Sequence, residues 1–168
     1  MSEDIIMDGT DGTDTVGSYV IIHRMKCLTY GTSGPNLGVI TAVAAVDGTI
    51  TAQISIGAGQ TLMAIYGIPS IQTAYMPNFY VNLHDNTSPA TATEISFSLL
   101  VNEIPDTLTT KYLIKHIGGL ISFGTSASDI PFRPYKKIVG PAIIKVQSIG
   151  SADDLFVSAG FDIILIDN

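Results

Sequence analysis

The last stretch of the chain, residues 136–168, reads KKIVGPAIIKVQSIGSADDLFVSAGFDIILIDN. From Leu155 to Leu165 every second residue is apolar, while Ser158, Gly160 and Asp162 stand in between. The apolar set is Leu155, Val157, Ala159, Phe161, Ile163 and Leu165. Because successive side chains of a strand point to opposite faces, this period of two predicts a strand with one buried and one partly wet face.

A second alternation precedes this strand. Ile144 and Val146 alternate with Lys145 and Gln147, and residues 150–154 form a cluster of turn formers between the two stretches. The pair predicts an antiparallel hairpin whose second strand ends the chain. We expect that strand to lie inside a sheet, because such an apolar strand would template aggregation if its edge were open.

The composition restricts the class of protein. The 168 residues suffice for one domain with a real core. Charged residues make up only 14%, well below the usual share of about 25%. The surface is therefore built from small polar residues or is covered by other subunits, and we favour the second reading. The net charge of −7 argues against nucleic-acid binding, which needs clustered Lys and Arg.

Targeting and redox features are few. Cys27 is the single cysteine, so an internal disulfide is impossible, and its apolar surroundings predict an inert core thiol. The acidic first residues do not resemble a signal peptide, and no apolar run reaches the roughly 18 residues of a membrane span. We expect synthesis in the cytosol and no membrane contact.

The first residues predict a flexible acidic arm. Residues 1–16 hold five acids and two glycines, a composition that does not build a core. Asp8, Asp11 and Asp14 lie three apart with no closing Glu, which does not fit a calcium loop. The apolar residues Ile5, Ile6 and Met7 are expected to dock on a neighbour. The predicted organisation is an arm, 1–16, followed by a single β-sandwich domain, 17–168.

Strand patterns fill the rest of the chain, and no stretch keeps a helical period. The sequence around Asp47-Gly48 predicts a hairpin, because this dipeptide favours tight turns. Pro131 and Pro134 predict a loop or an edge segment over 126–135. The expected strands are Tyr19–Leu28, Val39–Val46, Thr49–Ile56, Thr61–Gly67, 79–84, 95–102, Tyr112–Ile117 and Leu120–Phe123, besides the final pair. We predict an all-β, jelly-roll-like β-sandwich of roughly 8–10 antiparallel strands.

The search for catalytic chemistry finds no site. His23, His84 and His116 fall in three separate predicted strands, without the close spacing of metal ligands. Gly57–Thr61 resembles part of a phosphate loop but lacks the Lys and the following helix. We therefore expect no enzyme activity, no cofactor and no bound metal.

The basic residues lie close together in sequence. Lys111, Lys115, Arg133, Lys136 and Lys137 fall within 27 residues, and aromatic residues are interleaved with the last three. They form either a solvated edge or a patch that receives a neighbour's acidic arm or another acidic surface. The candidate partner contacts are Ile5, Ile6, Met7, Arg133, Lys136 and Lys137.

Several stretches resemble a family of small virion structural proteins predicted in short-tailed bacteriophages. They are Gln60–Ser70, Gln72–Met76, Leu99–Asn102, Phe132–Lys137 and the stretch from Val157 to the end. The resemblance covers residues 39–168 and brings no catalytic motif. It implies a virion component, such as a capsid decoration (cement) protein of jelly-roll type.

Two functions follow as hypotheses. The first is a structural protein that binds the major capsid protein or other virion subunits and also itself. Phe156, Ile164 and Ile166, opposite the main apolar set, suggest contact between subunits, and three-fold shell positions favour a homotrimer. The alternative is a tail-associated adaptor or a receptor- or carbohydrate-binding β-sandwich protein.

Overall fold

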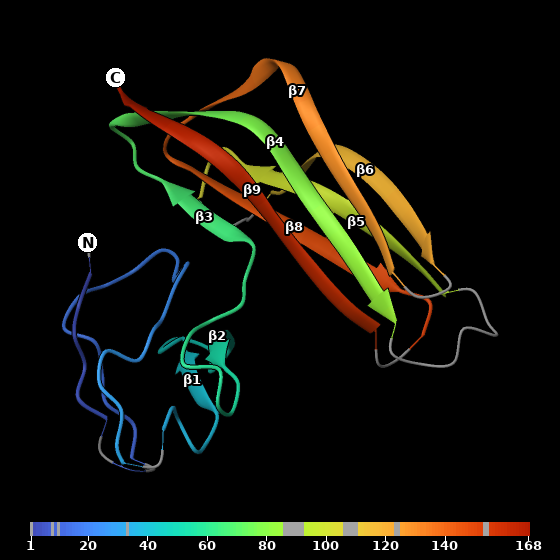
Figure 1. The fold of residues 1–168 in the computed structure, drawn as a ribbon. Helices are drawn as coiled ribbons and strands as arrows, with labels where there is room; N and C mark the ends of the chain where they lie inside the picture. Colours follow the sequence, from blue (N-terminus) through green and yellow to red (C-terminus); the bar gives the residue numbers. More distant parts are fainter. Residues whose placement is uncertain are drawn as a thin grey trace. The chain divides into compact units, whose positions relative to one another are not determined.

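Most stretches of alternating apolar residues form strands in the computed structural model, which describes residues 2–7, 9, 11–32, 34–85, 93–105, 111–122, 125–152 and 155–168. The described residues form nine strands and no helix, which confirms the predicted all-β class (Figure 1). Two units form, Met1–Thr61 and Leu62–Asn168. The strands are β1 (Ile40–Val43), β2 (Ile50–Ile54), β3 (Ile65–Ile68), β4 (Gln72–Asp85), β5 (Thr93–Asn102), β6 (Leu113–Ser122), β7 (Thr125–Val139), β8 (Ala142–Gly150) and β9 (Leu155–Asp167).

The second unit is a β-sandwich, as predicted. One sheet has the order β3-β8-β5-β6 and the other has the order β7-β4-β9, with every pairing antiparallel. Apart from the β5–β6 hairpin, each connection from β3 to β9 leads from one sheet to the other. This alternation between sheets is the jelly-roll-like winding that the sequence predicts.

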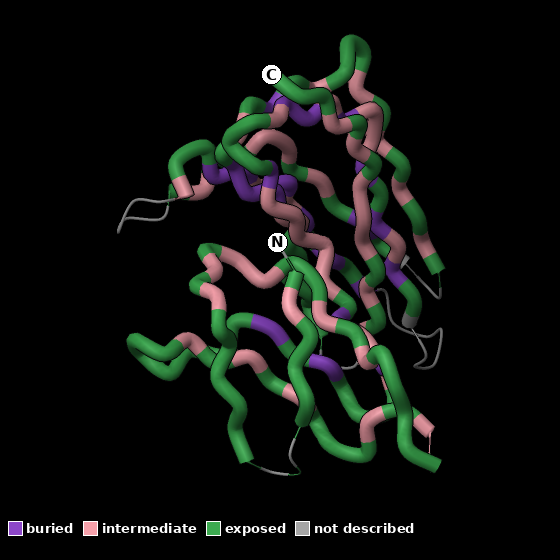
Figure 2. The backbone as a smooth tube through the Cα atoms, turned by 90° about the vertical axis from the view of Figure 1, so that its left-hand side faces the viewer, coloured by how far each residue is buried: buried purple, intermediate pink, exposed green. Residues whose placement is uncertain are grey.

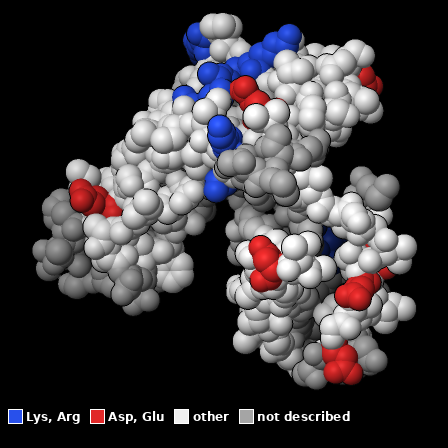
Figure 3. All heavy atoms as spheres, turned by 180° about the vertical axis from the view of Figure 1, so that it is seen from behind, with Lys and Arg blue, Asp and Glu red and all other residues white. Residues whose placement is uncertain are grey.

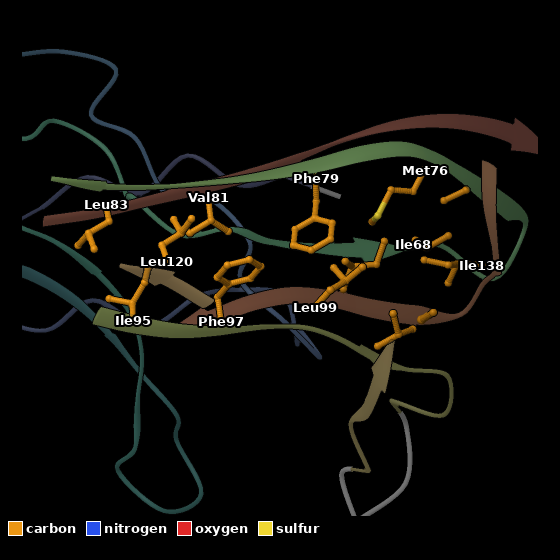
Figure 4. Packing of buried hydrophobic residues seen from close by; sticks show 14 residues of the cluster. Ile68, Met76, Phe79, Val81, Leu83, Ile95, Phe97, Leu99, Leu120 and Ile138 are labelled. Atoms are coloured by element: carbon orange, nitrogen blue, oxygen red, sulfur yellow. The ribbon is translucent and has the colours of Figure 1, made fainter. Parts of the chain in front are cut away.

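The core lies between the two sheets of the second unit. Met76, Phe79, Val81 and Leu83 of β4 point toward the opposite sheet (Figure 4). Phe79 is 0% exposed, and its ring centroid lies 6.0 Å from that of Phe97 and 5.9 Å from that of Phe132. Other enclosed apolar positions of this unit include Ala74, Ile95, Leu99, Val101, Ala142 and Ile144.

Strand β9 contributes a less deeply buried inner row than we expected. Its residues Val157, Phe161, Ile163 and Leu165 pack against the core cluster but remain half-buried. The predicted facing is confirmed, whereas the predicted burial of these four side chains is only partial. The cause is the position of β9 at the end of its sheet, where one side of each side chain lacks a neighbouring strand.

The predicted terminal hairpin is wrong. β8 pairs with β5 and β3, while β9 pairs with β4, so the two strands lie in different sheets. Consequently β9 is an edge strand and not an inner strand of its sheet. Alternation identifies the buried face of a strand, but it does not identify the neighbour that shares its hydrogen bonds.

Gly118 and Gly119 lie inside one strand, β6, where we predicted two short strands and a turn. A Cβ atom at Gly118 would lie 2.4 Å from Cζ of Phe97. Glycine is therefore required here because the Phe97 ring packs directly on the backbone of the neighbouring strand. The segment with Pro131 and Pro134 belongs to β7, which is the edge strand that the prolines predicted.

The first unit contains the predicted hairpin around Asp47-Gly48. β1 and β2 pair antiparallel, and the Ala44 amide donates to the Thr49 carbonyl at 2.8 Å. Gly48 has a φ of 73°, in the left-handed region that glycine tolerates. Figure 2 shows mostly exposed and intermediate positions in this unit, with Ala52 and Ile54 of β2 among its buried residues.

Residues 19–28 do not form the strand that we predicted. Within them only Lys26 takes part in a β-bridge, with Gln60. A strand is stabilised by a partner along its length, and residues 59–61 are too few to pair with the whole segment. The two units divide at Thr61, whereas the predicted boundary lies at residue 16.

Replacing the central core ring tests this packing. We expect Phe79→Ala to lower the free energy of unfolding by about 3–5 kcal/mol, since it empties an enclosed site. The matched control is Phe156→Ala, because Phe156 is largely exposed on β9; it should cost under about 1 kcal/mol. Urea unfolding measures both values, and equal losses would contradict the assignment of the inner and outer faces.

Candidate functional site

The titratable side chains are the first candidates for a functional site. Among the residues that the structure describes, no three His, Cys, Asp or Glu side chains gather as a metal site. His116 packs against the Phe79 ring at 5.4 Å between centroids, and His84 Nδ1 lies 2.9 Å from Thr125 Oγ1. Asp8, one of the three acids tested for calcium, lies outside the described residues. The features that remain are surfaces, which we take in turn.

A bulge in β7 carries the first surface. Met76 pairs with Lys136 and Asn78 pairs with Pro131, so Phe132 to Tyr135 stand opposite Pro77 alone. Phe132 anchors this bulge by stacking on Phe79, at 21° between ring planes. The three following residues, Arg133, Pro134 and Tyr135, are exposed. The bulge thus presents a cation and an aromatic ring from a rigid base, which suits protein recognition.

The predicted basic contacts are distributed differently over this strand. Lys137 is exposed and pairs with Tyr75. Lys136 pairs with the enclosed Met76 and is half-buried, so the two lysines occupy opposite faces of β7. Arg133 and Lys137 are therefore the exposed members of the group, and their contact with a partner stays a prediction.

The other basic residues of this unit are partly engaged. Lys115 Nζ lies 2.7 Å from Glu103 Oε1, and Lys145 Nζ lies 4.3 Å from the centre of the Tyr112 ring. Figure 3 shows that Lys and Arg side chains gather on one face of this unit, where fewer acidic side chains are visible. The exposed basic side chains of this unit are therefore Arg133 on the bulge, Lys137 and Lys111.

The acidic arm folds back on itself through Glu3. Its carboxylate accepts hydrogen bonds from the Val16 amide at 2.7 Å, the Gly17 amide at 3.2 Å and the Tyr19 hydroxyl at 2.9 Å. The two amide bonds and the Tyr19 bond hold the pKa of Glu3 below its usual value, and the Glu3 bond raises the pKa of Tyr19. Ile5, Ile6 and Met7 are exposed, and their docking on a neighbour stays a prediction.

The free edge of β9 forms the second surface; the sequence predicted its outer apolar row as a subunit contact, but neither its edge position nor the groove beside it. Phe156, Ile164 and Ile166 on its outer side are 59%, 48% and 52% exposed. A groove of about 430 Å³ lies along this edge. The lining residues include Met63, Ala64, Ile65, Tyr66, Phe161, Ile163 and Leu165. The signal that could have predicted this open edge is the presence of apolar residues on both faces of one strand.

The Tyr80 side chain reaches this same edge. Tyr80 pairs with Gly160 across β4 and β9, and a Cβ atom at Gly160 would clash with the Tyr80 hydroxyl. Gly160 therefore leaves room for the tyrosine to lie across β9. The phenol contributes a polar group to a groove that is otherwise largely apolar.

No protein-family model, curated protein or solved structure gives a significant match to this chain. The described residues contain no helix long and apolar enough to cross a membrane. The two surfaces, the β7 bulge and the β9 edge, are therefore the features that bear on function.

The Glu3 hydrogen bonds predict acid-sensitive folding of the arm. A lowered carboxyl pKa means that the stabilising contact is present above the usual Glu pKa and is lost as the pH falls through the lowered value. In an NMR titration, the Val16 and Gly17 amide signals should shift with a midpoint below 4.5, the ordinary value for Glu. Glu3→Gln should abolish that titration, whereas Asp14→Asn should retain it. A midpoint at or above 4.5 would contradict the fold-back.

Proposed function

We propose that the protein is a non-enzymatic virion structural protein. In this proposal it is a capsid decoration (cement) protein that binds the phage shell and also associates with itself, as a homotrimer. It is made in the host cytoplasm and ends in the virion. The observation that carries the proposal is the exposure of rows of large apolar side chains on a β-sandwich with few charges.

Edge strands of both sheets show this exposure. On β6, Ile114, Ile117 and Ile121 are each more than half exposed. On β9, Phe156, Ile164 and Ile166 have comparable exposure. Single exposed apolar residues are common on monomeric proteins, whereas rows of them mark contact surfaces. These rows support a subunit that is covered in an assembly.

The charge distribution supports an acidic partner surface for the bulge. Arg133 and Lys137 are exposed in a chain whose net charge is −7. The first unit carries six acids and two basic residues, a net charge of −4. A positive bulge facing an acidic arm of a neighbour, or an acidic shell surface, favours oriented association. The resemblance of residues 39–168 to small virion proteins supports the shell as the setting.

Copy number in purified particles tests the role. A decoration protein should be present in copies comparable to the major capsid protein, on the order of hundreds, since it repeats with the shell lattice. Quantitative mass spectrometry against labelled peptides of both proteins gives this ratio. A few copies per particle would contradict decoration and favour the tail-associated adaptor or the receptor-binding protein.

Charge reversal on the bulge tests the binding surface. We expect Arg133→Glu combined with Lys137→Glu to weaken shell binding about tenfold at low salt, since each exposed ion pair contributes up to about 1 kcal/mol. The difference should shrink at high salt because exposed charges are screened. The double change Lys111→Glu and Lys26→Glu, which alters the net charge equally, is the control. Equal losses in both double variants would show a net-charge effect and contradict a specific role for the bulge.

A further inference from the structure

The outer face of the β7-β4-β9 sheet carries a largely polar patch between the β7 bulge and the β9 edge. Tyr80 of β4 pairs with Asp129 of β7 on one side and with Gly160 of β9 on the other. Residues two positions apart on a strand lie on the same face, so three cross-strand rows belong to this patch. They are Pro131, Asn78 and Asp162; Asp129, Tyr80 and Gly160; and Ala127, Asn82 and Ser158. We call these nine residues the Tyr80 patch.

The Tyr80 side chain lies along the sheet and does not stand up from it. A Cβ atom at Gly160 would clash with the Tyr80 hydroxyl and would lie 2.8 Å from Cε2 of the ring. The hydroxyl end of the ring therefore lies over Gly160, while the residue stays 39% exposed. An aromatic side chain that covers a glycine of an edge strand stabilises the sheet. The same arrangement also presents a fixed aromatic surface on which a ligand can stack.

Polar side chains surround this ring. Asn78 Nδ2 donates to Asp129 Oδ1 at 3.1 Å, and Asn82 Nδ2 donates to Ser158 Oγ at 3.3 Å. Asp129, Ser158 and Asp162 are exposed. Each amide has two donors and an acceptor oxygen, and each carboxylate accepts several hydrogen bonds. These side chains therefore hold one another in place and keep donors and acceptors for a ligand.

This combination is complementary to a neutral saccharide. Every sugar hydroxyl donates and accepts hydrogen bonds, whereas the C–H groups on the face of a sugar ring are apolar and stack on the negative face of an aromatic ring. The Tyr80 patch has the aromatic ring at its centre and hydrogen-bonding groups around it. It contains two carboxylates and no Lys, Arg or His, so it repels anionic sugars.

The separation of the two carboxylates disfavours a basic partner. β7 and β9 lie on opposite sides of β4, so their backbones are about 10 Å apart. Asp129 and Asp162 therefore stand on either side of the Tyr80 ring. Two carboxylates hold one ammonium or guanidinium group only when both are within hydrogen-bonding distance of it. A ligand with several hydroxyls spread around a ring matches this spacing better.

We propose that the Tyr80 patch binds a neutral saccharide, which stacks on the Tyr80 ring and bonds through its hydroxyls to Asp129, Asp162 and Asn82. This inference goes beyond the shell-binding role of the proposed function, and the binding itself does not depend on that role. On a shell that carries many copies, sites of millimolar affinity would together hold a particle at a polysaccharide surface.

An NMR titration of the isotope-labelled protein tests the site. The probes are cellohexaose, chitohexaose, laminarihexaose and maltohexaose, each up to about 10 mM. We expect at least one to bind with a Kd of about 1 mM or tighter and to shift the side-chain amide signals of Asn78 and Asn82. Tyr80→Ala should weaken binding at least about tenfold, because it removes the stacking surface. The matched control is Tyr135→Ala, which removes another exposed tyrosine of this sheet and should leave the Kd unchanged.

Two further variants keep the test valid if Tyr80→Ala does not fold. Asp162→Asn changes an exposed residue and should weaken binding severalfold, since hydrogen bonds to a charged group are the stronger ones. Gly160→Ala keeps the ring but displaces its hydroxyl end, so it should also weaken binding. Unchanged affinity in both variants would contradict the proposed contacts.

The remaining outcomes separate this inference from the proposed function. Absence of binding by all four saccharides overturns the inference and leaves the shell role intact, because that role is measured on particles. Equal losses in Tyr80→Ala and Tyr135→Ala also overturn it. If trilysine shifts the Asn78 and Asn82 signals and no saccharide does, the patch belongs to a basic partner and the inference is wrong. Saccharide binding at the patch with a few copies per particle contradicts decoration and supports the inference.

Discussion

The packing of the inner row of β4 against β5 is the contact on which the sandwich depends. β4 is bonded along both edges, by β7 and β9, and its inner residues from Ala74 to Leu83 are enclosed. The Phe79 ring meets Phe97 edge-on across the core and stacks on Phe132 of the neighbouring strand. Burial of one such side chain contributes about 1.5–3 kcal/mol, so this row orients both sheets. The same ring also fixes the position of the β7 bulge, because Phe132, at the base of the bulge, stacks on Phe79.

Sequence alternation predicted the faces of the sandwich well. Ile95, Phe97, Leu99 and Val101 are enclosed, as their period of two predicts. The Asp47-Gly48 hairpin could also be predicted, because its tight turn requires a positive φ and glycine at position 48 tolerates one. These features depend on a few neighbouring residues, and the local sequence contains the information they need.

Pairing between distant strands could not be predicted in the same way. The stretches 142–150 and 155–167 satisfy every local criterion for a hairpin, yet they lie in different sheets. Gly118-Gly119 has the composition of a turn, and only the position of Phe97 on the adjacent strand explains why the chain continues straight. The same limit applies to the candidate surfaces: the basic cluster was visible in the sequence, but the opposite facing of Lys136 and Lys137 depends on the register with β4.

An exposed apolar edge strand such as β9 favours aggregation unless another segment covers it. Natural edge strands are commonly protected by charges, prolines or bulges. β7 has two prolines and a bulge, whereas β9 has no proline and has Asp162 and Asp167 as its charged residues. Ordering a ten-residue strand on this edge costs on the order of 10–20 kcal/mol in backbone entropy. Hydrogen bonds of about 1 kcal/mol each cannot offset that cost alone, so apolar contacts on both faces of the added strand are also needed. The groove on one side and the row of Phe156, Ile164 and Ile166 on the other offer both contacts.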